Sequence, residues 1–207
     1  MMHEEVLDEK RRAVFAKLSQ FPDFYLSGGT ALAFYLGHRI SVDFDLFSSQ
    51  KIPRDLLEKI EKVYQGSSVL PSVNNPDELT VFINSVKTTF LFYPFPVVLG
   101  FTEYQGIQLS SVKEIAATKA YALGRRVAYR DYIDLYFVLA ERHATLSEII
   151  EIAERKYAEN FNSRLFLEQL VDVEEPQDTS LIFLKGEIGK AQMEQLFRNA
   201  VSEIKID

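Results

Sequence analysis

The residue pattern changes character part-way along the 207-residue chain, and this change limits the folds that are open to it. Before about residue 105, short apolar runs typical of strands alternate with helical patterns. After that point, apolar residues recur almost throughout at the three- and four-residue spacing of helices. The sequence therefore predicts an α+β (mixed α/β) fold, with a small mixed β-sheet flanked by helices over residues 1–105 and a mainly helical C-terminal lobe over residues 106–207.

The expected elements follow from these patterns. Strand-like runs cover residues 24–26, 42–47, 79–83, 88–93 and, more weakly, 106–109. Helical patterns cover residues 4–18, 30–36 and 53–64 in the first part, and 111–123, 129–141, 147–156, 164–171 and 190–204 in the second. The first two expected strands and the helix between them carry the residues with the strongest chemical pattern.

The composition narrows the chemistry that the chain can carry. It has no cysteine, and its three histidines (His3, His38 and His143) are too scattered to form a metal cage, so any metal must be held by oxygen ligands. No apolar run approaches the roughly 20 residues that cross a membrane, and no apolar signal core lies near the start. We therefore expect a cytoplasmic protein without a membrane partner.

Charge limits nucleic-acid binding to a local surface. The net charge of −7 disfavours binding along the whole surface, because phosphate attraction needs a positive footprint. A basic stretch nevertheless covers residues 113–130, in which a single acid, Glu114, stands among five basic residues: Lys113, Lys119, Arg125, Arg126 and Arg130. Any contact with nucleic acid is expected there.

Two aspartates alternate with apolar residues along the strand expected at 42–47. Asp43 and Asp45 are two residues apart, so on a strand they project from one face with α-carbons about 6 to 7 Å apart. Two carboxylates held this close repel each other, and a fold retains them at low cost only at the surface or around a cation. They could bind Mg²⁺ or Mn²⁺ against nucleotide phosphates, or they could simply form the solvated face of a half-exposed strand.

A glycine pair precedes the aspartates at the junction of a strand and a helix. Along Ser27, Gly28, Gly29 and Thr30, backbone N–H groups and the positive end of a helix can meet phosphate oxygens without a side chain blocking their approach. Glycine pairs also make ordinary tight turns, so this motif alone is weak. One short helix separates it from the aspartates, so the two strands could lie side by side and form a site for a nucleoside triphosphate.

Two segments of the chain resemble a known family. The sequence SGGTALAFYLGHRISVDFDLFS, residues 27–48, resembles the first motif of the AbiEii/AbiGii-type nucleotidyltransferase toxins, within the DNA polymerase β-like superfamily. Residues 111–136 resemble the family's K-x-x-A-L-x-x-R followed by R-D-x-x-D-L, in the positions Lys119, Ala122, Leu123, Arg126, Arg130, Asp131, Asp134 and Leu135. Beyond about residue 145 no correspondence is recognisable. The resemblance implies a nucleotidyltransferase-like core, with Lys119 as a catalytic or nucleotide contact and with Asp131 and Asp134 in the site.

The spacing of the charged residues in the second motif shows which of them can share a helix face. Lys119 and Arg126 are seven apart and share a helix face, so an ammonium and a guanidinium could reach one phosphate chain. Arg130 and Asp134, four apart, could instead form an ordinary ion pair. Arg39 could contact phosphate or be solvated, whereas His38 is expected to be structural or exposed. The candidate catalytic residues are Asp43, Asp45, Lys119 and Asp134, with Asp43 and Asp45 as metal ligands; the candidate nucleotide-binding residues are Ser27, Gly28, Gly29, Thr30, Arg39, Lys119, Arg126, Arg130 and Asp131.

One position departs from the superfamily pattern. The superfamily often has a third acidic residue on a later strand, and the segment at 86–91 places Thr89 there. A hydroxyl is a poor base and a weak ligand beside a carboxylate, so the usual activation of an incoming hydroxyl is in doubt. Asp131 and Asp134 are the candidates to compensate.

The resemblance implies transfer of a nucleoside monophosphate from a nucleoside triphosphate (NTP) to an acceptor hydroxyl, with release of pyrophosphate. It also implies the toxin of a toxin–antitoxin or phage-defence pair, with a cognate antitoxin and with RNA, such as tRNA, or protein as the acceptor. Two alternatives stay open: a small-molecule nucleotidyltransferase of the antibiotic-modifying kind, and a nucleotide-binding regulatory protein that has lost turnover. The absence of a carboxylate at Thr89 favours the last of these.

Overall fold

The computed structural model describes residues 2–123, 125, 128–173 and 181–204. In these residues a seven-stranded sheet has the order β3-β4-β5-β2-β1-β7-β6. The strands are β1 (Tyr25–Ser27), β2 (Asp43–Ser48), β3 (Val69–Asn74), β4 (Glu78–Ile83), β5 (Val86–Phe92), β6 (Phe101–Tyr104) and β7 (Ile107–Ser110). β2 runs antiparallel to β1 and parallel to β5, and β1 runs parallel to β7. The sheet is therefore mixed, and the strand with the two aspartates is its central strand.

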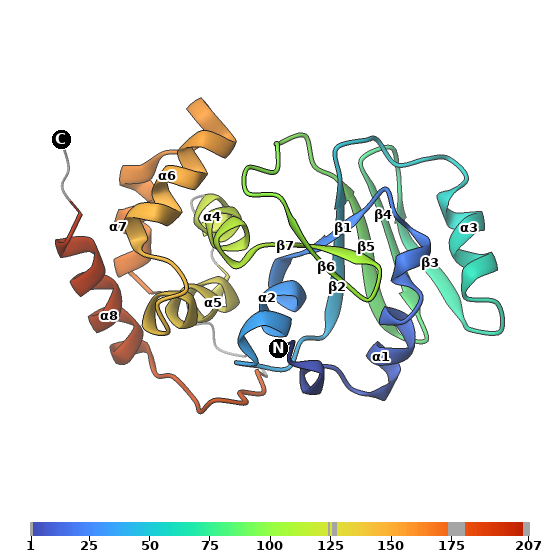
Figure 1. The fold of residues 1–207 in the computed structure, drawn as a ribbon, viewed down its shortest axis with the longest axis horizontal. Helices are drawn as coiled ribbons and strands as arrows, with labels where there is room; N and C mark the ends of the chain where they lie inside the picture. Colours follow the sequence, from blue (N-terminus) through green and yellow to red (C-terminus); the bar gives the residue numbers. More distant parts are fainter. Residues whose placement is uncertain (1, 124, 126–127, 174–180, 205–207) are drawn as a thin grey trace.

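The helices divide into two groups. The first group, α1 (Glu9–Phe15), α2 (Gly28–Leu36) and α3 (Leu56–Val63), accompanies the sheet. The second group forms a helical lobe beside the sheet (Figure 1) and consists of α4 (Val112–Leu123), α5 (Tyr129–Ala140), α6 (Leu146–Tyr157), α7 (Ser163–Val171) and α8 (Lys190–Ser202). α2 contacts β1 and β2 as well as α4 and α5, so it lies between the two groups. None of the helices in the described ranges has the length and apolar character needed to span a bilayer.

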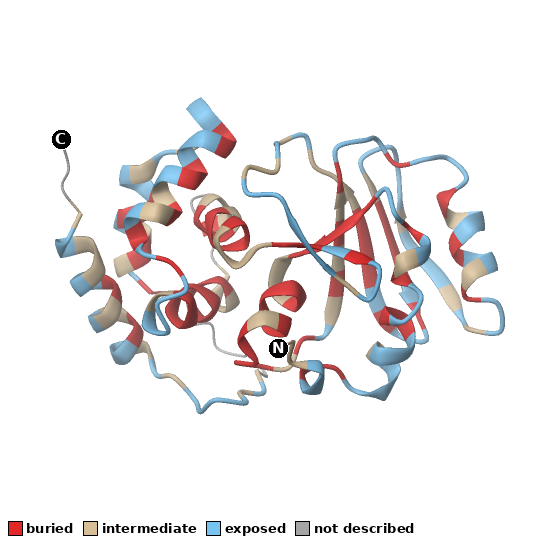
Figure 2. Ribbon diagram, in the orientation of Figure 1, coloured by how far each residue is buried: buried red, intermediate tan, exposed pale blue. Residues whose placement is uncertain are grey.

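Buried and half-buried residues alternate along β2, and this alternation shows which side chains face the core. Phe44 and Leu46 are fully buried, whereas Asp43 and Asp45 are half-buried. The Phe15 ring packs against Phe34 of α2 and Phe44 of β2, with ring centroids 4.8 Å and 6.1 Å apart. Figure 2 shows the resulting core between the central strands and the helices that cover one face of the sheet. The aspartates consequently face away from this core.

The α+β architecture predicted from the sequence is confirmed, with two local differences. The single helix expected at 4–18 is wrong, because this segment forms the 3₁₀ turns η1 (Glu4–Val6) and η2 (Leu18–Gln20) around a shorter α1. β3 and β6 were not predicted; they are the two edge strands, and their mostly exposed residues lack a buried alternation. The sheet continues through β7 to Ser110, and the boundary near residue 105 stays a prediction.

Candidate functional site

The two aspartates of β2 lie directly beside the end of β1. Asp45 is in register with Ser27 of β1 on one side and with Thr89 of β5 on the other. Asp43 is in register with Lys87 of β5. The side-by-side arrangement expected for the two strands is therefore confirmed, and it brings the glycine turn after Ser27 next to the carboxylates.

Glycine is required where α2 begins. Gly28 has a φ of +69°, and a Cβ atom there would lie 2.9 Å from Oδ2 of Asp45. A Cβ atom on Gly29 would lie 2.4 Å from Nη2 of Arg39. The N-cap residue Ser27 makes no side-chain capping hydrogen bond among the described residues, and the first turn of α2 has no acidic side chain. Its first N–H groups and the positive end of its dipole are therefore arranged as a site for an anion.

A buried cluster of charges lies next to this turn and joins the loop after α2 to α4 and α5. The Lys119 ammonium lies 2.7 Å from Oδ1 of Asp131 and 2.6 Å from Oδ2 of Asp134. Arg39 donates to both oxygens of Asp134, from Nε at 2.8 Å and from Nη2 at 2.9 Å. All four side chains are buried. Such a bidentate pair fixes the guanidinium in one orientation, so this cluster holds the sheet and the helical lobe in one geometry.

His38 completes the cluster. It is fully buried, and its Nε2 lies 2.6 Å from Oδ1 of Asp134. Its Nδ1 is buried without a hydrogen-bond partner among the described residues. An imidazole that donates from Nε2 and keeps Nδ1 unprotonated satisfies both observations, because a protonated ring would bury a second N–H donor without an acceptor. His38 is therefore a neutral, buried hydrogen-bond donor to Asp134.

The cluster shifts the pKa of Asp134, Lys119 and His38. Burial alone would raise the pKa of Asp134, but the charges of Arg39 and Lys119 and the hydrogen bonds of His38 and Arg39 hold it well below its usual value. Burial would lower the pKa of Lys119, but Asp134 and Asp131 raise it. Burial lowers the pKa of His38 against the opposing hydrogen bond to Asp134. Asp134 is thus ionised and poorly suited to accept a proton at neutral pH.

The shift of His38 predicts a loss of stability in mild acid. The unfolded chain protonates this histidine near its ordinary pKa of about 6.5, whereas the folded chain resists protonation, so the contribution is present above that pH and is lost as the pH falls towards the lowered pKa. Asp134, whose pKa is also lowered, contributes in the same direction only below about pH 4. Urea unfolding at several pH values should show the wild type losing up to about 1.4 kcal/mol more per pH unit than His38→Gln. Parallel curves for the two proteins would contradict the neutral assignment.

Thr30 and Ser41 hold the acidic strand in place. The two hydroxyl oxygens lie 2.5 Å apart, and Thr30 also donates to the backbone carbonyl of Asp43. Both residues are almost fully buried. Thr30, which the sequence assigned to nucleotide binding, therefore uses its hydroxyl to fix the start of β2.

Thr89 occupies the position expected for a third acidic residue. It lies opposite Asp45 in the neighbouring strand and is buried. Its hydroxyl lies 3.3 Å from that of Thr80 on β4, which in turn donates to the carboxylate of Glu78 at 2.6 Å. The nearest acid in this row of hydroxyls therefore comes from β4, one strand further from Asp45.

The described residues contain no group of three or more acidic or histidine side chains that could by itself hold a metal ion. Asp43 and Asp45 supply two carboxylates, and Gly28 leaves space beside Asp45 that a Cβ atom would fill. Mg²⁺ is commonly bound by one or two carboxylates together with substrate phosphates and water. The two aspartates fit a metal that arrives with a nucleotide, in contrast to a permanently bound structural ion.

The sequence also predicts two further basic residues, Arg126 and Arg130, as nucleotide contacts. Arg126 lies outside the described residues. Arg130 does not pair with Asp134 in the described part of the chain, because Asp134 bonds to Arg39, Lys119 and His38; Arg130 lies beside Arg39 on a small cavity of about 30 Å³. Within the basic stretch, Lys119 is buried in ion pairs and Lys113 pairs with Glu148. The described basic surface there is smaller than the sequence suggested.

The chain matches a protein-family model over residues 12–205, and that model describes the nucleotidyl transferase AbiEii toxin of type IV toxin–antitoxin systems. The chain belongs to the AbiEii nucleotidyltransferase toxin family. It is 29% identical over 183 residues to an uncharacterised protein of Aquifex aeolicus (strain VF5). The aligned region covers 87% of this chain and 87% of that protein. The family assignment confirms the resemblance seen in the two sequence motifs, and the protein is a nucleotidyltransferase.

Solved structures share the AbiEii fold of this chain. The nucleotidyltransferase toxin MenT4 of Mycobacterium tuberculosis H37Rv superposes with a TM-score of 0.60 at 14% identity, over 93% of this chain and 83% of the toxin. The protein JHP933 of Helicobacter pylori superposes with a TM-score of 0.54 at 14% identity, over 98% of this chain and 96% of its own. The similarity extends through the helical lobe, where the sequence alone gave no correspondence beyond about residue 145.

Proposed function

We propose that this AbiEii-family protein moves a nucleoside monophosphate from an NTP to a hydroxyl group of RNA, such as tRNA, and that it acts in the cytoplasm as the toxin partner of a cognate antitoxin. The register of Asp45 beside Ser27, with the start of α2 against its carboxylate, carries this proposal. Phosphoryl transfer needs positioning and charge stabilisation more than covalent chemistry. A phosphate cradle and a pair of carboxylates on adjacent strands supply both.

Each group has a separate role in the proposal. The N–H groups at Gly28 and Gly29 bind phosphate oxygens of the nucleotide, and Asp43 and Asp45 hold Mg²⁺ or Mn²⁺. Such a metal, when bound, neutralises charge on the phosphates and lowers the pKa of the attacking hydroxyl. Within the described residues the Lys119 ammonium uses two of its three donors on Asp131 and Asp134, and we assign the third to a phosphate oxygen.

The role of Asp134 in this proposal is positioning. Its carboxylate is saturated by three neighbours, and its pKa is low because of Arg39 and Lys119, so it orients the Lys119 ammonium and does not accept the proton of the acceptor hydroxyl. Asp131 holds the same ammonium from the other side. Asp134 therefore does not replace the missing acid at Thr89 as a base.

The proposal is tested by incubating the purified protein with Mg²⁺, each labelled NTP in turn and total RNA. Label in RNA together with pyrophosphate release is the expected result. Pyrophosphate release that requires a small-molecule acceptor and not RNA would favour the antibiotic-modifying alternative. Nucleotide binding without pyrophosphate release would contradict turnover, and label in protein would contradict an RNA acceptor.

A substitution at Gly28 should damage the site more than the fold. In Gly28→Ala the new Cβ must displace the Asp45 carboxylate, which lies 2.9 Å from its position, and a misplacement of about 1 Å can lower turnover roughly a hundredfold. The measurement is the initial rate of nucleotidyl transfer, with a thermal melt for folding. Gly66→Ala is the matched control, since Gly66 also has a positive φ, of +87°, but its Cβ would meet nothing within 4 Å. Equal losses of activity in both variants would show that backbone strain, and not Asp45, is responsible.

A further inference from the structure

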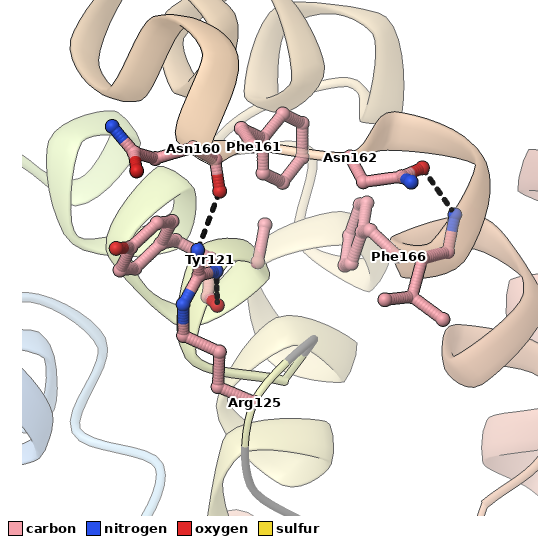
Figure 3. Close-up of a pocket in the computed structure, with 8 residues that line it drawn as sticks. Tyr121, Arg125, Asn160, Phe161, Asn162 and Phe166 are labelled. Atoms are coloured by element: carbon pink, nitrogen blue, oxygen red, sulfur yellow. Dashed lines mark hydrogen bonds between the residues drawn. The ribbon is translucent and has the colours of Figure 1, made fainter.

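A second concave site lies on the far side of α4 from the charge cluster. It is a cavity of about 220 Å³ between the end of α4, the 3₁₀ turn η3 (Ala158–Asn160) and the start of α7 (Figure 3). Its walls combine aromatic rings, Tyr121, Phe161 and Phe166, with the guanidinium of Arg125 and the amides of Asn160 and Asn162. Flat apolar walls with a few polar groups are typical of sites for planar ligands.

The guanidinium of Arg125 is held in one orientation. Its Cζ lies 3.6 Å from the centroid of the Tyr121 ring, Nη1 donates to the carbonyl of Tyr121, and Nη2 donates to the carbonyl of Asn160. The opposite face of the Tyr121 ring stacks on Tyr157 at 3.8 Å. Within the described residues Arg125 makes no ion pair with a carboxylate, so its charge is available to an anionic ligand. A fixed, planar cation of this kind is a stacking surface for a nucleobase.

The amides beside the guanidinium can read the edge of a base. Oδ1 of Asn162 accepts from the backbone N–H of Leu165 at 2.9 Å and so caps α7, which leaves the NH₂ group of Asn162 as a donor. The side chain of Asn160 makes no hydrogen bond within the described residues and offers both a donor and an acceptor. Donors and acceptors next to a stacking plane match the chemistry of an unpaired base.

A row of aromatic rings fixes the position of this pocket relative to the aspartates. Phe47 follows Asp45 by two residues on the same face of β2, and its ring contacts Tyr93 at 5.0 Å. Tyr93 contacts Phe95 at 5.3 Å, and Phe95 contacts Tyr121 at 5.3 Å. The row spans the gap between the sheet and the helical lobe. A continuous series of ring contacts therefore links the pocket to the strand that carries the two carboxylates.

We propose that the pocket of Tyr121, Arg125, Asn160, Asn162, Phe161 and Phe166 binds an unpaired nucleobase of the RNA acceptor; this inference rests on the proposed function. Tyr121 is two residues after Lys119, so the two side chains point to nearly opposite sides of α4. A nucleotide with its phosphates at Gly28 cannot also place its base across that helix. A polynucleotide whose end reaches Asp45 can, and Arg125 supplies the positive charge that its backbone needs.

The test measures RNA binding without turnover. The probes are a labelled stem–loop RNA with a short unpaired 3′ end and the same stem–loop with a blunt end, added to the protein without NTP. Arg125→Ala should weaken binding of the unpaired end about tenfold or more, because a stacked base contributes about 1–3 kcal/mol, and should weaken binding of the blunt RNA only as slightly as the loss of one surface charge does. Arg125→Lys should not restore binding, since an ammonium has no stacking plane. The dissociation constant for NTP, measured without RNA, should stay the same in both variants.

Arg164→Ala is the charge-matched control, because Arg164 of α7 is exposed and pairs only with the exposed Glu168 among the described residues. It should affect both RNAs equally and slightly. The proposal is overturned if Arg125→Ala weakens both RNAs equally, if it raises the dissociation constant for NTP, or if either a folded Arg125→Ala or a folded Arg125→Lys binds the unpaired end as the wild type does. Because no transfer is required, selective RNA binding with no labelled product would refute the proposed function and leave this pocket supported.

Discussion

Replacing both metal-binding candidates, in Asp43→Asn with Asp45→Asn, should lower nucleotidyl transfer by about three orders of magnitude while the protein stays folded, because a bound metal contributes several kcal/mol to transition-state charge stabilisation. Both carboxylates are half-buried on the face of β2 opposite Phe44 and Leu46, and the amides have the same shape, so these core residues keep their packing. Initial rates at several Mg²⁺ concentrations would measure the effect.

The control for this pair is Glu103→Gln, which removes an exposed carboxylate from β6 at the edge of the same sheet. Its rate should equal that of the wild type. A double variant that retains more than about a tenth of the activity would remove these aspartates from the metal site, since the loss would then be below about 1.4 kcal/mol.

Removing Asp134 should produce the largest loss of stability of any single substitution in the site. In Asp134→Ala the buried groups of Arg39, Lys119 and His38 lose their shared acceptor, and breaking a buried ion pair typically costs about 3–5 kcal/mol. For a chain of this size the melting temperature should fall by roughly 10 °C. Differential scanning calorimetry of the apo protein gives the measurement without any substrate.

The matched control is Asp77→Ala, because Asp77 pairs with Lys51 at the exposed surface. Such a surface pair contributes at most about 1 kcal/mol. If the two variants melted at similar temperatures, the cluster around Asp134 would not join the two lobes as described.

The first half of the fold could be predicted from local sequence patterns, because β2 and α2 carry strong ones. The alternation of Phe44 and Leu46 with Asp43 and Asp45 gave the strand and its exposed face together. Gly37, at φ +59°, ends α2 where the pattern placed its end. Edge strands β3 and β6 could not be found in this way, because an exposed edge imposes no periodic burial on its residues.

The charge cluster shows what local patterns cannot reveal. Asp134 is 95 residues from Arg39 and 96 from His38, so no spacing rule connects them, and the sequence suggested Arg130 as a partner four residues away. His38 was expected to be structural or exposed, and its burial against Asp134 depends on how α2 packs on α5. Motif resemblance identified Asp134, but only tertiary packing shows that its oxygens are already occupied.

The edge strand β3 affects whether copies of this chain pair through their sheets in solution. An edge strand offers unpaired backbone groups to other strands, and exposed apolar residues such as Leu70, which is 62% exposed, strengthen that tendency. Pro71 follows directly and lacks an N–H group, and the pairing of β3 with β4 shifts register between Pro71 and Val73. The hydrogen-bonding edge of β3 is thus interrupted next to the exposed Leu70. This interruption disfavours edge-to-edge pairing of sheets from different copies of the chain at high concentration.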